Sequence, residues 1–228
     1  MNTRYFGQST LLGITCLAVL LSTAACGEKK AAEGTAPKTE AASTVKEGWT
    51  EIASSGFKVS LPKGWNAIDL TAGDLDKVMD AAMAASPGAK SMEAQIRAAA
   101  SSGMIKVMAL HPKDGETDFV ENMNVVVTDL PSGVTLKQIE EAYRSQVGAM
   151  SVPGSEIKGD PVDLPVGKAM RMQTKLNMQS GANKYVASLA YMFAEGGKSY
   201  TVTFSSKPDR ETAIIAEADE IMSTFKIG

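Results

Sequence analysis

Cysteine and histidine are almost absent from this chain, which contains two cysteines, Cys16 and Cys26, and one histidine, His111. A structural zinc site needs about four ligands of these kinds, and a catalytic one about three. Cys16 lies in an N-terminal apolar run that we expect to be removed, so only Cys26 would remain in the mature protein. The sequence therefore argues against an internal disulfide and a Cys/His zinc site, and we expect no cofactor and no bound metal.

A basic excess is missing as well. The chain has 23 lysines and arginines against 26 aspartates and glutamates, and its formal net charge is -3. Domains that hold DNA or RNA by the phosphates normally carry a surplus of positive charge, so we expect no nucleic-acid partner. An acidic surface also matches anionic lipid headgroups poorly. Any attachment to a membrane would therefore have to be covalent or apolar.

Two common catalytic motifs are also absent, the G-x-S-x-G motif of hydrolases and the H-E-x-x-H motif of zinc proteases. His111 lies in the loop-like stretch "LHPKD" and has no accompanying nucleophile motif, so we expect a surface histidine. A catalytic carboxylate pair would need a cleft that drives two pKa values apart. We expect solvated helix faces instead for the clustered acids, and hence no enzyme; these acids are Glu140, Glu141, Glu217, Asp219 and Glu220.

What the chain does have is an apolar run near its N-terminus. Residues 1–10 carry one charged side chain, Arg4, and are followed by "LLGITCLAVLLSTAA". This stretch is short of the roughly 20 residues that cross a bilayer as a helix. It has the order of regions that is typical of an export signal. The pattern predicts a signal peptide over residues 1–25 and an extracytoplasmic protein.

The stretch "TAAC" at 23–26 resembles the lipobox of bacterial lipoproteins, in which small residues precede a cysteine. The resemblance implies that Cys26 is acylated on its sulfur and becomes the first residue of the mature chain. Two or more acyl chains anchor a protein stably to a membrane. Thr23 stands where leucine is usual, so ordinary cleavage after Ala25 stays an alternative. Gly27, in place of aspartate, implies sorting to the outer membrane in a cell with two membranes.

A polar segment follows Cys26. Residues 27–48, "GEKKAAEGTAPKTEAASTVKEG", are rich in alanine, glutamate, lysine, threonine and glycine and contain no aromatic residue. Such a segment buries too little apolar surface to offset the entropy lost on ordering. We expect a disordered tether over residues 26–48, which as a flexible coil would span on the order of 25 Å.

Residues 49–228 have the patterns of one folded domain. Alternating residues predict strands within 49–65, 104–111 and 119–130, and a meander of three strands follows within 169–206. Apolar spacing predicts two helices within 71–102, separated by a break at Ser86–Pro87–Gly88. It also predicts a helix that a Thr135–Gln138 capping box opens and Gly148 ends, and a last helix from Pro208 to Phe225. Antiparallel strands with helices between and after them predict an α+β fold.

Two short motifs carry a family resemblance over residues 49–228. The first is F-x-V-x-x-P-x-x-W at its start, and the second is I-x-x-[ST]-F near its end. The chain resembles PsbP-like domains, a group that includes the DcrB- and LpqN-type envelope lipoproteins. The resemblance implies an α/β/α sandwich with a mainly antiparallel sheet and no shared active site. The residues that carry it are Phe57, Val59, Pro62, Trp65, Ile221, Thr224 and Phe225.

Methionine is the one residue type in unusual number, with 13 in the chain. Met170, Met172 and Met178, with Met192 on a neighbouring strand, offer thioethers that suit Cu(I). They also lie on the apolar face of their strand, where methionine fills irregular core space. The periodicity favours core filling. A methionine-lined pocket for a lipid or another apolar ligand is a third interpretation.

Together these features predict a lipid-anchored binding or assembly protein of the cell envelope, without catalysis. Its partners would be the membrane, through the anchor on Cys26, and an unidentified protein or small apolar ligand. A carrier of Cu(I) or of an apolar ligand, bound through the methionine-rich strands, is the alternative.

Overall fold

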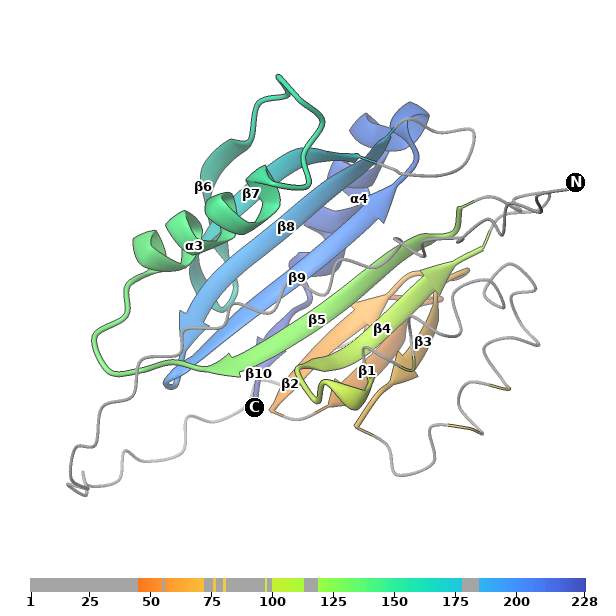
Figure 1. Ribbon diagram of the computed structural model, residues 1–228. Coiled ribbons are helices and arrows are strands. Elements are labelled where there is room, and N and C mark those ends of the chain that lie inside the picture. The colour runs from red at the N-terminus through yellow and green to blue at the C-terminus, as the bar shows by residue number, and fades with distance from the viewer. Residues whose placement is uncertain are drawn as a thin grey trace, which may run out of the picture.

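The computed structural model describes residues 45–54, 56–71, 76, 80, 97, 100–112, 119–177 and 185–228. Two antiparallel sheets account for its strands (Figure 1). The large sheet has seven strands in the order β3 (Asn66–Asp69), β4 (Ile105–His111), β5 (Glu121–Asp129), β9 (Lys198–Ser206), β8 (Tyr185–Glu195), β7 (Gly167–Asn177) and β6 (Lys158–Leu164). The small sheet has three, in the order β1 (Thr50–Ser54), β2 (Phe57–Leu61) and β10 (Lys226–Ile227).

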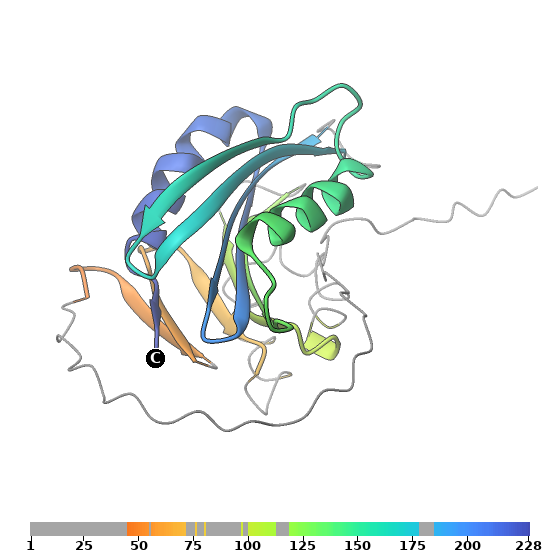
Figure 2. The same cartoon turned by 90° about the vertical axis from the view of Figure 1, so that its left-hand side faces the viewer.

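Helices cover both faces of the large sheet, as Figure 2 shows. Helix α3 (Leu136–Gly148) packs on β7 and β8. Helix α4 (Glu211–Met222) lies on the opposite face, which it shares with the small sheet, and contacts β2 and β9. Every pairing between the described strands is antiparallel. The predicted α+β fold, an α/β/α sandwich with an antiparallel sheet, is therefore confirmed.

The hairpin of β1 and β2 shows why these residues form strands. Phe57, Val59 and Leu61 alternate along β2 and are almost fully buried in the main core, as period-2 spacing predicts for a strand with one face inward. Ser60, expected on the open face, is also buried. Its N–H donates to Oγ1 of Thr224 at 2.9 Å, so the segment after α4 covers this side of β2.

Helix α3 begins where the sequence predicts. The Thr135 side chain accepts from the Gln138 N–H while the Gln138 side chain accepts from the Thr135 N–H, which completes a capping box. The predicted inward residues Ile139, Tyr143 and Val147 are buried. They form a second, smaller core against β7 and β8.

The last helix is divided in two. Pro208 opens a 3-10 turn, η2 (Pro208–Arg210), before α4 starts, because proline suits a first turn where no N–H is needed. Helix α4 ends at Met222, three residues before the predicted end, and Phe225 is nonetheless fully buried. Its ring stacks on Phe57 with centroids 5.2 Å apart.

Strands β3, β6 and β10 were not predicted. Strand β3 has four residues and β10 has two, too few for an alternating pattern. Strand β6 contains Gly159 and Pro161, which are both depleted in strands, and it takes the sheet edge where proline is tolerated. Pairing with their neighbours, rather than local sequence, makes these segments strands.

The two helices expected within 71–102 lie mostly outside the described residues, as do the break between them and their inward residues. Within this range, Asp76, Asp80, Arg97, Ala100 and Ser101 have helical backbone. None of the helices in the described ranges is both long and apolar enough to span a membrane.

Candidate functional site

Helix α4 carries several acidic side chains, and these pair with basic residues outside the helix. Glu211 lies 3.2 Å from Lys175 of β7, and Asp219 lies 3.0 Å from Arg171 of the same strand. Glu220 lies 2.8 Å from Lys46, ahead of β1. Asp219 and Glu220 keep about half of their side chains exposed and fit the predicted solvated face, although each pairs with a cation from a distant segment. Glu217 is only 20% exposed, so for this residue the prediction is wrong.

Glu217 belongs to the most enclosed of these groups, the His111 cluster, which comprises Trp65, His111, Glu121, Arg210 and Glu217. His111 ends β4 and lies directly opposite Glu121 of β5 in the strand register. Its Nδ1 is 3.6 Å from Glu121 Oε2 and 3.6 Å from Glu217 Oε1. The imidazole stacks on the Trp65 indole with centroids 4.9 Å apart. Trp65 Nε1 in turn donates to Glu217 Oε1 at 2.7 Å.

Arg210 supplies the positive charge of this cluster. Its Nε donates to Glu121 Oε1 at 3.1 Å and its Nη2 donates to Glu217 Oε2 at 3.2 Å. The hydrogen bond to Glu121 is the main reason that the pKa of Arg210 is raised. Since Glu121 is fully buried, a nearby cation is what makes a charged carboxylate tolerable there.

A tight turn holds the histidine in place. Gly64 has φ +100°, a conformation that favours glycine. A Cβ at this position would lie only 3.2 Å from His111 Nε2. The glycine therefore permits the turn to pass close to the imidazole and to place Trp65 over it.

The expectation of a surface position for His111 is wrong, since only 18% of its side chain is exposed. Trp65 stacks on its ring, and Glu121 and Glu217 lie beside Nδ1. Nδ1 is buried and makes no hydrogen bond within the described part of the chain. The arrangement holds α4 on the sheet by charge and stacking.

A second polar cluster lies further along α4. Tyr191 Oη donates to Asp219 Oδ1, and Arg171 Nη1 donates to both oxygens of the same carboxylate at 3.2 and 3.0 Å. Burial, followed by the Asp219 carboxylate, raises the pKa of Tyr191. Burial opposes the charge of Arg171, but Asp219 outweighs it and raises the pKa of Arg171. These contacts also stabilise the position of α4.

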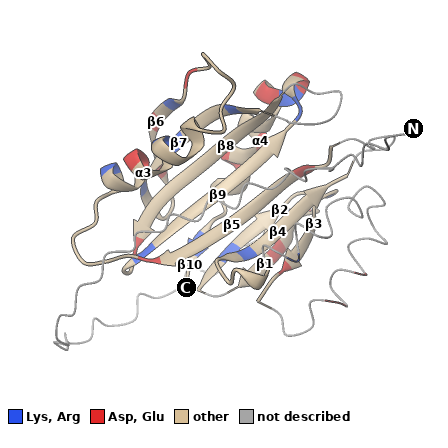
Figure 3. Ribbon diagram, viewed as in Figure 1, with Lys and Arg blue, Asp and Glu red and all other residues tan. Residues whose placement is uncertain are grey.

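The two acids of α3 behave differently from those of α4. Glu140 bonds Arg144 at 2.8 Å, and Arg144 also donates to the Ile157 carbonyl at 2.6 Å. Glu141 lies 3.9 Å from Lys137, and both side chains are mostly exposed. Figure 3 shows basic residues beside acidic ones along α3, whereas α4 itself contains acids and no lysine or arginine. Glu141 thus fits the predicted solvated face, whereas Glu140 takes part in a partly buried network.

The methionines proposed as a thioether site lie in the smaller core. Met172 is fully buried and Met192 is 1% exposed, within the cluster that contains Ile139, Tyr143 and Val147 of α3. Met170 is partly buried and faces Met192 directly across β7 and β8. This burial agrees with core filling. Met178 lies outside the described residues.

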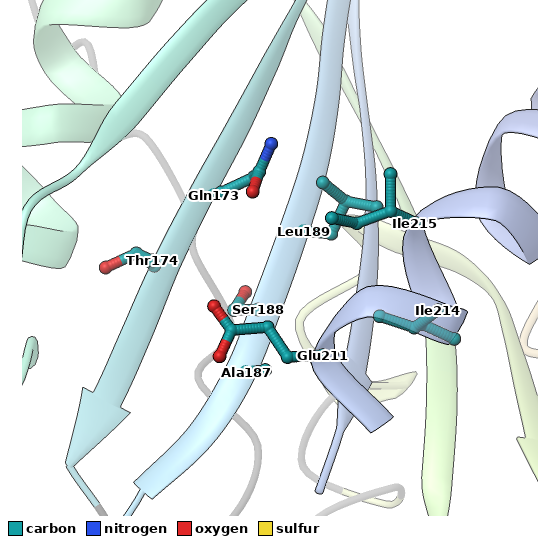
Figure 4. A pocket seen from close by; sticks show the side chains of 8 residues that line it. All are labelled: Gln173, Thr174, Ala187, Ser188, Leu189, Glu211, Ile214 and Ile215. Carbon is teal, nitrogen blue, oxygen red and sulfur yellow. The ribbon is translucent and has the colours of Figure 1, made fainter. Parts of the chain in front are cut away.

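Two of the hollows on the described surface lie away from the His111 cluster. One, between α4 and strands β7 and β8, holds only about 10 Å³, and Figure 4 shows Gln173, Leu189 and Ile215 closing on it while Thr174 points away. The other is a shallow depression of about 390 Å³ beside the β1–β2 turn, lined by Ala53, Ser54, Gly56, Phe57, Lys58 and Gly228. Neither contains the His111 cluster.

No group of three or more histidine, cysteine or acidic side chains in the described ranges is arranged to hold a metal ion. Cys26, the predicted lipidation site, lies outside those ranges. Sequence reasoning missed Trp65, Glu121 and Arg210 as members of a cluster. The one local signal was the Gly64–Trp65 turn, because the other partners come together only through the strand register and the packing of α4.

Comparison with known proteins gives structural likeness alone. No family model matches the chain, and no curated protein matches it. The solution structure of cyanobacterial PsbP from Synechocystis sp. PCC 6803 is 16% identical, with a TM-score of 0.48, over 86% of this chain and 98% of that one. LpqN of Mycobacterium tuberculosis, described as involved in cell envelope biogenesis, is 10% identical, with a TM-score of 0.47, over 78% and 90%.

The Ran-binding protein Mog1p of Saccharomyces cerevisiae is similar to the same degree. It is 12% identical, with a TM-score of 0.48, over 78% of this chain and 95% of that one. At these values the likeness carries no argument about function, and the fold class rests on the strands and helices described above.

Proposed function

We propose that this chain is a lipid-anchored binding or assembly protein of the extracytoplasmic cell envelope, attached through Cys26 and without catalysis. The observation that carries the proposal is "TAAC" at 23–26, directly after the apolar run and well ahead of the first strand at Thr50. Once the apolar run that holds Cys16 is removed, Cys26 is the one cysteine left, so an internal disulfide is excluded. Acylation is the chemistry that uses this cysteine.

The described domain supports binding through its surface rather than catalysis in a cleft. Its enclosed carboxylates, Glu121 and Glu217, are engaged with Arg210, the Trp65 indole or the imidazole. Catalytic acids and bases are instead expected in a cleft that admits substrate. The two described hollows lie elsewhere, one with room for about a single water and the other shallow.

Labelling of the acyl chain tests the anchor. The full chain would be expressed in a bacterial host with radiolabelled palmitate as wild type, as Cys26→Ser and as Cys16→Ser. We expect label in the wild type and in Cys16→Ser, and neither label nor lipoprotein-type processing in Cys26→Ser. Normal processing of Cys26→Ser without label in any variant would show simple secretion instead.

A hydrolase panel tests the absence of catalysis. The mature full-length chain would be assayed beside His111→Gln and Glu217→Gln, which alter two of the partly exposed members of the His111 cluster. We expect no turnover by any of the three. Turnover by the wild type that either substitution removes would identify an active site and overturn this part of the proposal.

A second candidate function is a carrier of Cu(I) or of an apolar ligand. The observation that favours it is the direct opposition of Met170 and Met192, with Met172 two residues along the same strand. Two or three thioethers on adjacent strands suit a soft ion. An ion would have to enter a core that buries Met172 and Met192 almost completely, so we rank this function second.

A further inference from the structure

Residues 46–49, which precede β1, lie against α4 and form what we call the strap. Lys46 Nζ is 2.8 Å from Glu220 Oε1 and 4.7 Å from the centroid of the Trp49 ring. The Trp49 N–H donates to the Lys46 carbonyl at 3.0 Å, and Gly48 has φ +78° within this turn. One lysine therefore joins the tether both to α4 and to an aromatic ring.

Trp49 fixes the other end of the strap. Its side chain is partly buried and packs against the main core, next to the strand that begins at Thr50. In Figure 2, strand β1, which follows the strap, lies on the same side of the large sheet as α4 and on the opposite side from α3. A chain that leaves the domain at Val45 thus leaves beside the C-terminal half of α4.

We propose that the strap is a reversible clip that sets the length and exit direction of the membrane tether. With the clip closed, the free tether ends at residue 45, beside Glu220. With the clip open, it ends at Gly48, and three further residues add up to about 10 Å of reach. The benefit of a changed reach rests on the proposed lipid anchor, but the clip itself is intramolecular.

The contacts of the clip make it weak and sensitive to salt. The side chains of Lys46 and Glu220 are 47% and 54% exposed, and ion pairs of that kind contribute little and are screened. The proposed flexible tether would have an average span of about 25 Å, which is about three Debye lengths at physiological salt. Bulk ionic strength, rather than headgroup charge, should therefore decide whether the clip is closed.

Tryptophan fluorescence tests the clip directly. The chain has two tryptophans, so Trp65→Phe leaves Trp49 as the sole reporter. Raising NaCl from about 0.1 M to about 1 M shortens the Debye length from about 10 Å to about 3 Å. We expect a red shift of Trp49 emission and stronger acrylamide quenching, with the ratio of open to closed strap rising roughly two- to fivefold.

Matched variants in the Trp65→Phe background decide the cause. Lys46→Ala and Glu220→Ala should each show the high-salt emission already at about 0.1 M salt, with no further response. Lys137→Ala, which removes a comparable exposed charge from α3, should respond like the parent. Trp49 emission that is independent of salt and unchanged by Lys46→Ala would overturn the clip.

The test separates the clip from the anchor. In the Cys26→Ser chain, which lacks the proposed acylation site, Trp49 should show the same salt response, because all clip contacts are intramolecular. If Trp49 emission responds to salt in a protein that takes up no palmitate label, the anchor is refuted and the clip is not. If the protein takes up palmitate label but Trp49 emission does not respond to salt, the clip is refuted and the anchor is not.

Discussion

His111 and Glu121 lie directly opposite each other on β4 and β5, with Nδ1 of the imidazole 3.6 Å from Oε2 of the carboxylate. Both side chains lie on the sheet face that carries α4, and Glu121 is fully buried. The cation that faces Glu121, Arg210, comes from 89 residues further along the chain. This buried charge therefore depends on the docking of η2 and α4, and the dependence can be measured.

Arg210→Met should destabilise the protein. The substitution keeps the apolar stem of the side chain but removes the donor to Glu121 and Glu217. Loss of one partner from a fully buried pair costs about 3–5 kcal/mol. Because Arg210 remains about a third exposed, we expect the smaller cost of about 2 kcal/mol. Urea unfolding of the mature chain, followed by tryptophan fluorescence, measures it.

Two further variants show whether that cost comes from the pairing. Lys137→Met breaks an exposed pair on α3 and should change the free energy of unfolding by less than about 0.5 kcal/mol. Glu121→Gln combined with Arg210→Met should cost less than the sum of the single substitutions. Additive costs in this double-mutant cycle would contradict a coupled pair.

Gly159→Ala should destabilise the contact between β6 and α3. A Cβ at this position would lie 2.9 Å from the buried Met172 Sδ and would also press on the Arg144 guanidinium. Overpacking of this kind costs about 1–3 kcal/mol. Gly148→Ala is the matched control, since it has open space around it at the end of α3. It should stabilise by about 0.5–1 kcal/mol, and similar losses from both variants would count against the close approach.

Local patterns in the sequence were enough to predict much of the fold. The Thr135–Gln138 capping box, the β7–β8–β9 meander and the buried face of α4 all depend on residues within a few positions of one another. Strand β6 could not be predicted in this way, because its glycine and proline speak against a strand. It is a strand because seven of its residues pair with residues of β7.

Local sequence patterns did not predict the candidate site either, because its residues come together only in the folded chain. The apolar periodicity places Glu217 and Asp219 on the polar side of the last helix, but it does not identify the residues that face this side in the folded protein. Arg171 points towards α4 from a strand whose other face is apolar. The prediction of a surface position for His111 failed in the same way, since the turn at Gly64 and the packing of α4 enclose the imidazole.

Met172→Leu distinguishes core filling from a copper site. Leucine keeps the apolar volume but removes the thioether, so the free energy of unfolding should change by less than about 1.5 kcal/mol. We expect Cu(I) titration of the mature chain to be the same for the wild type, Met170→Leu and Met172→Leu. Loss of measurable Cu(I) affinity in either variant would favour the carrier function over core filling.

The phenol of Tyr143 lies in the smaller core under α3 and bonds Ser188. Burial raises its pKa from 10.0 to about 12, although the hydrogen bond to Ser188 acts in the opposite direction. The folded state therefore holds the phenolic proton more tightly than the unfolded state. This contribution to stability is complete below pH 10.0 and is lost as pH rises through about 12.

Tyr143→Phe should remove that part of the alkaline loss. In the wild type the free energy of unfolding should fall by up to about 3 kcal/mol between about pH 10 and pH 12 because of this group. The variant should be about 1 kcal/mol less stable at pH 7, since Ser188 loses a buried partner, yet it should fall less steeply in alkali. Tyr185→Phe, at the half-buried start of β8, is the control and should keep the wild-type slope. Parallel alkaline curves for the wild type and Tyr143→Phe would show that the phenol ionises without opening the core.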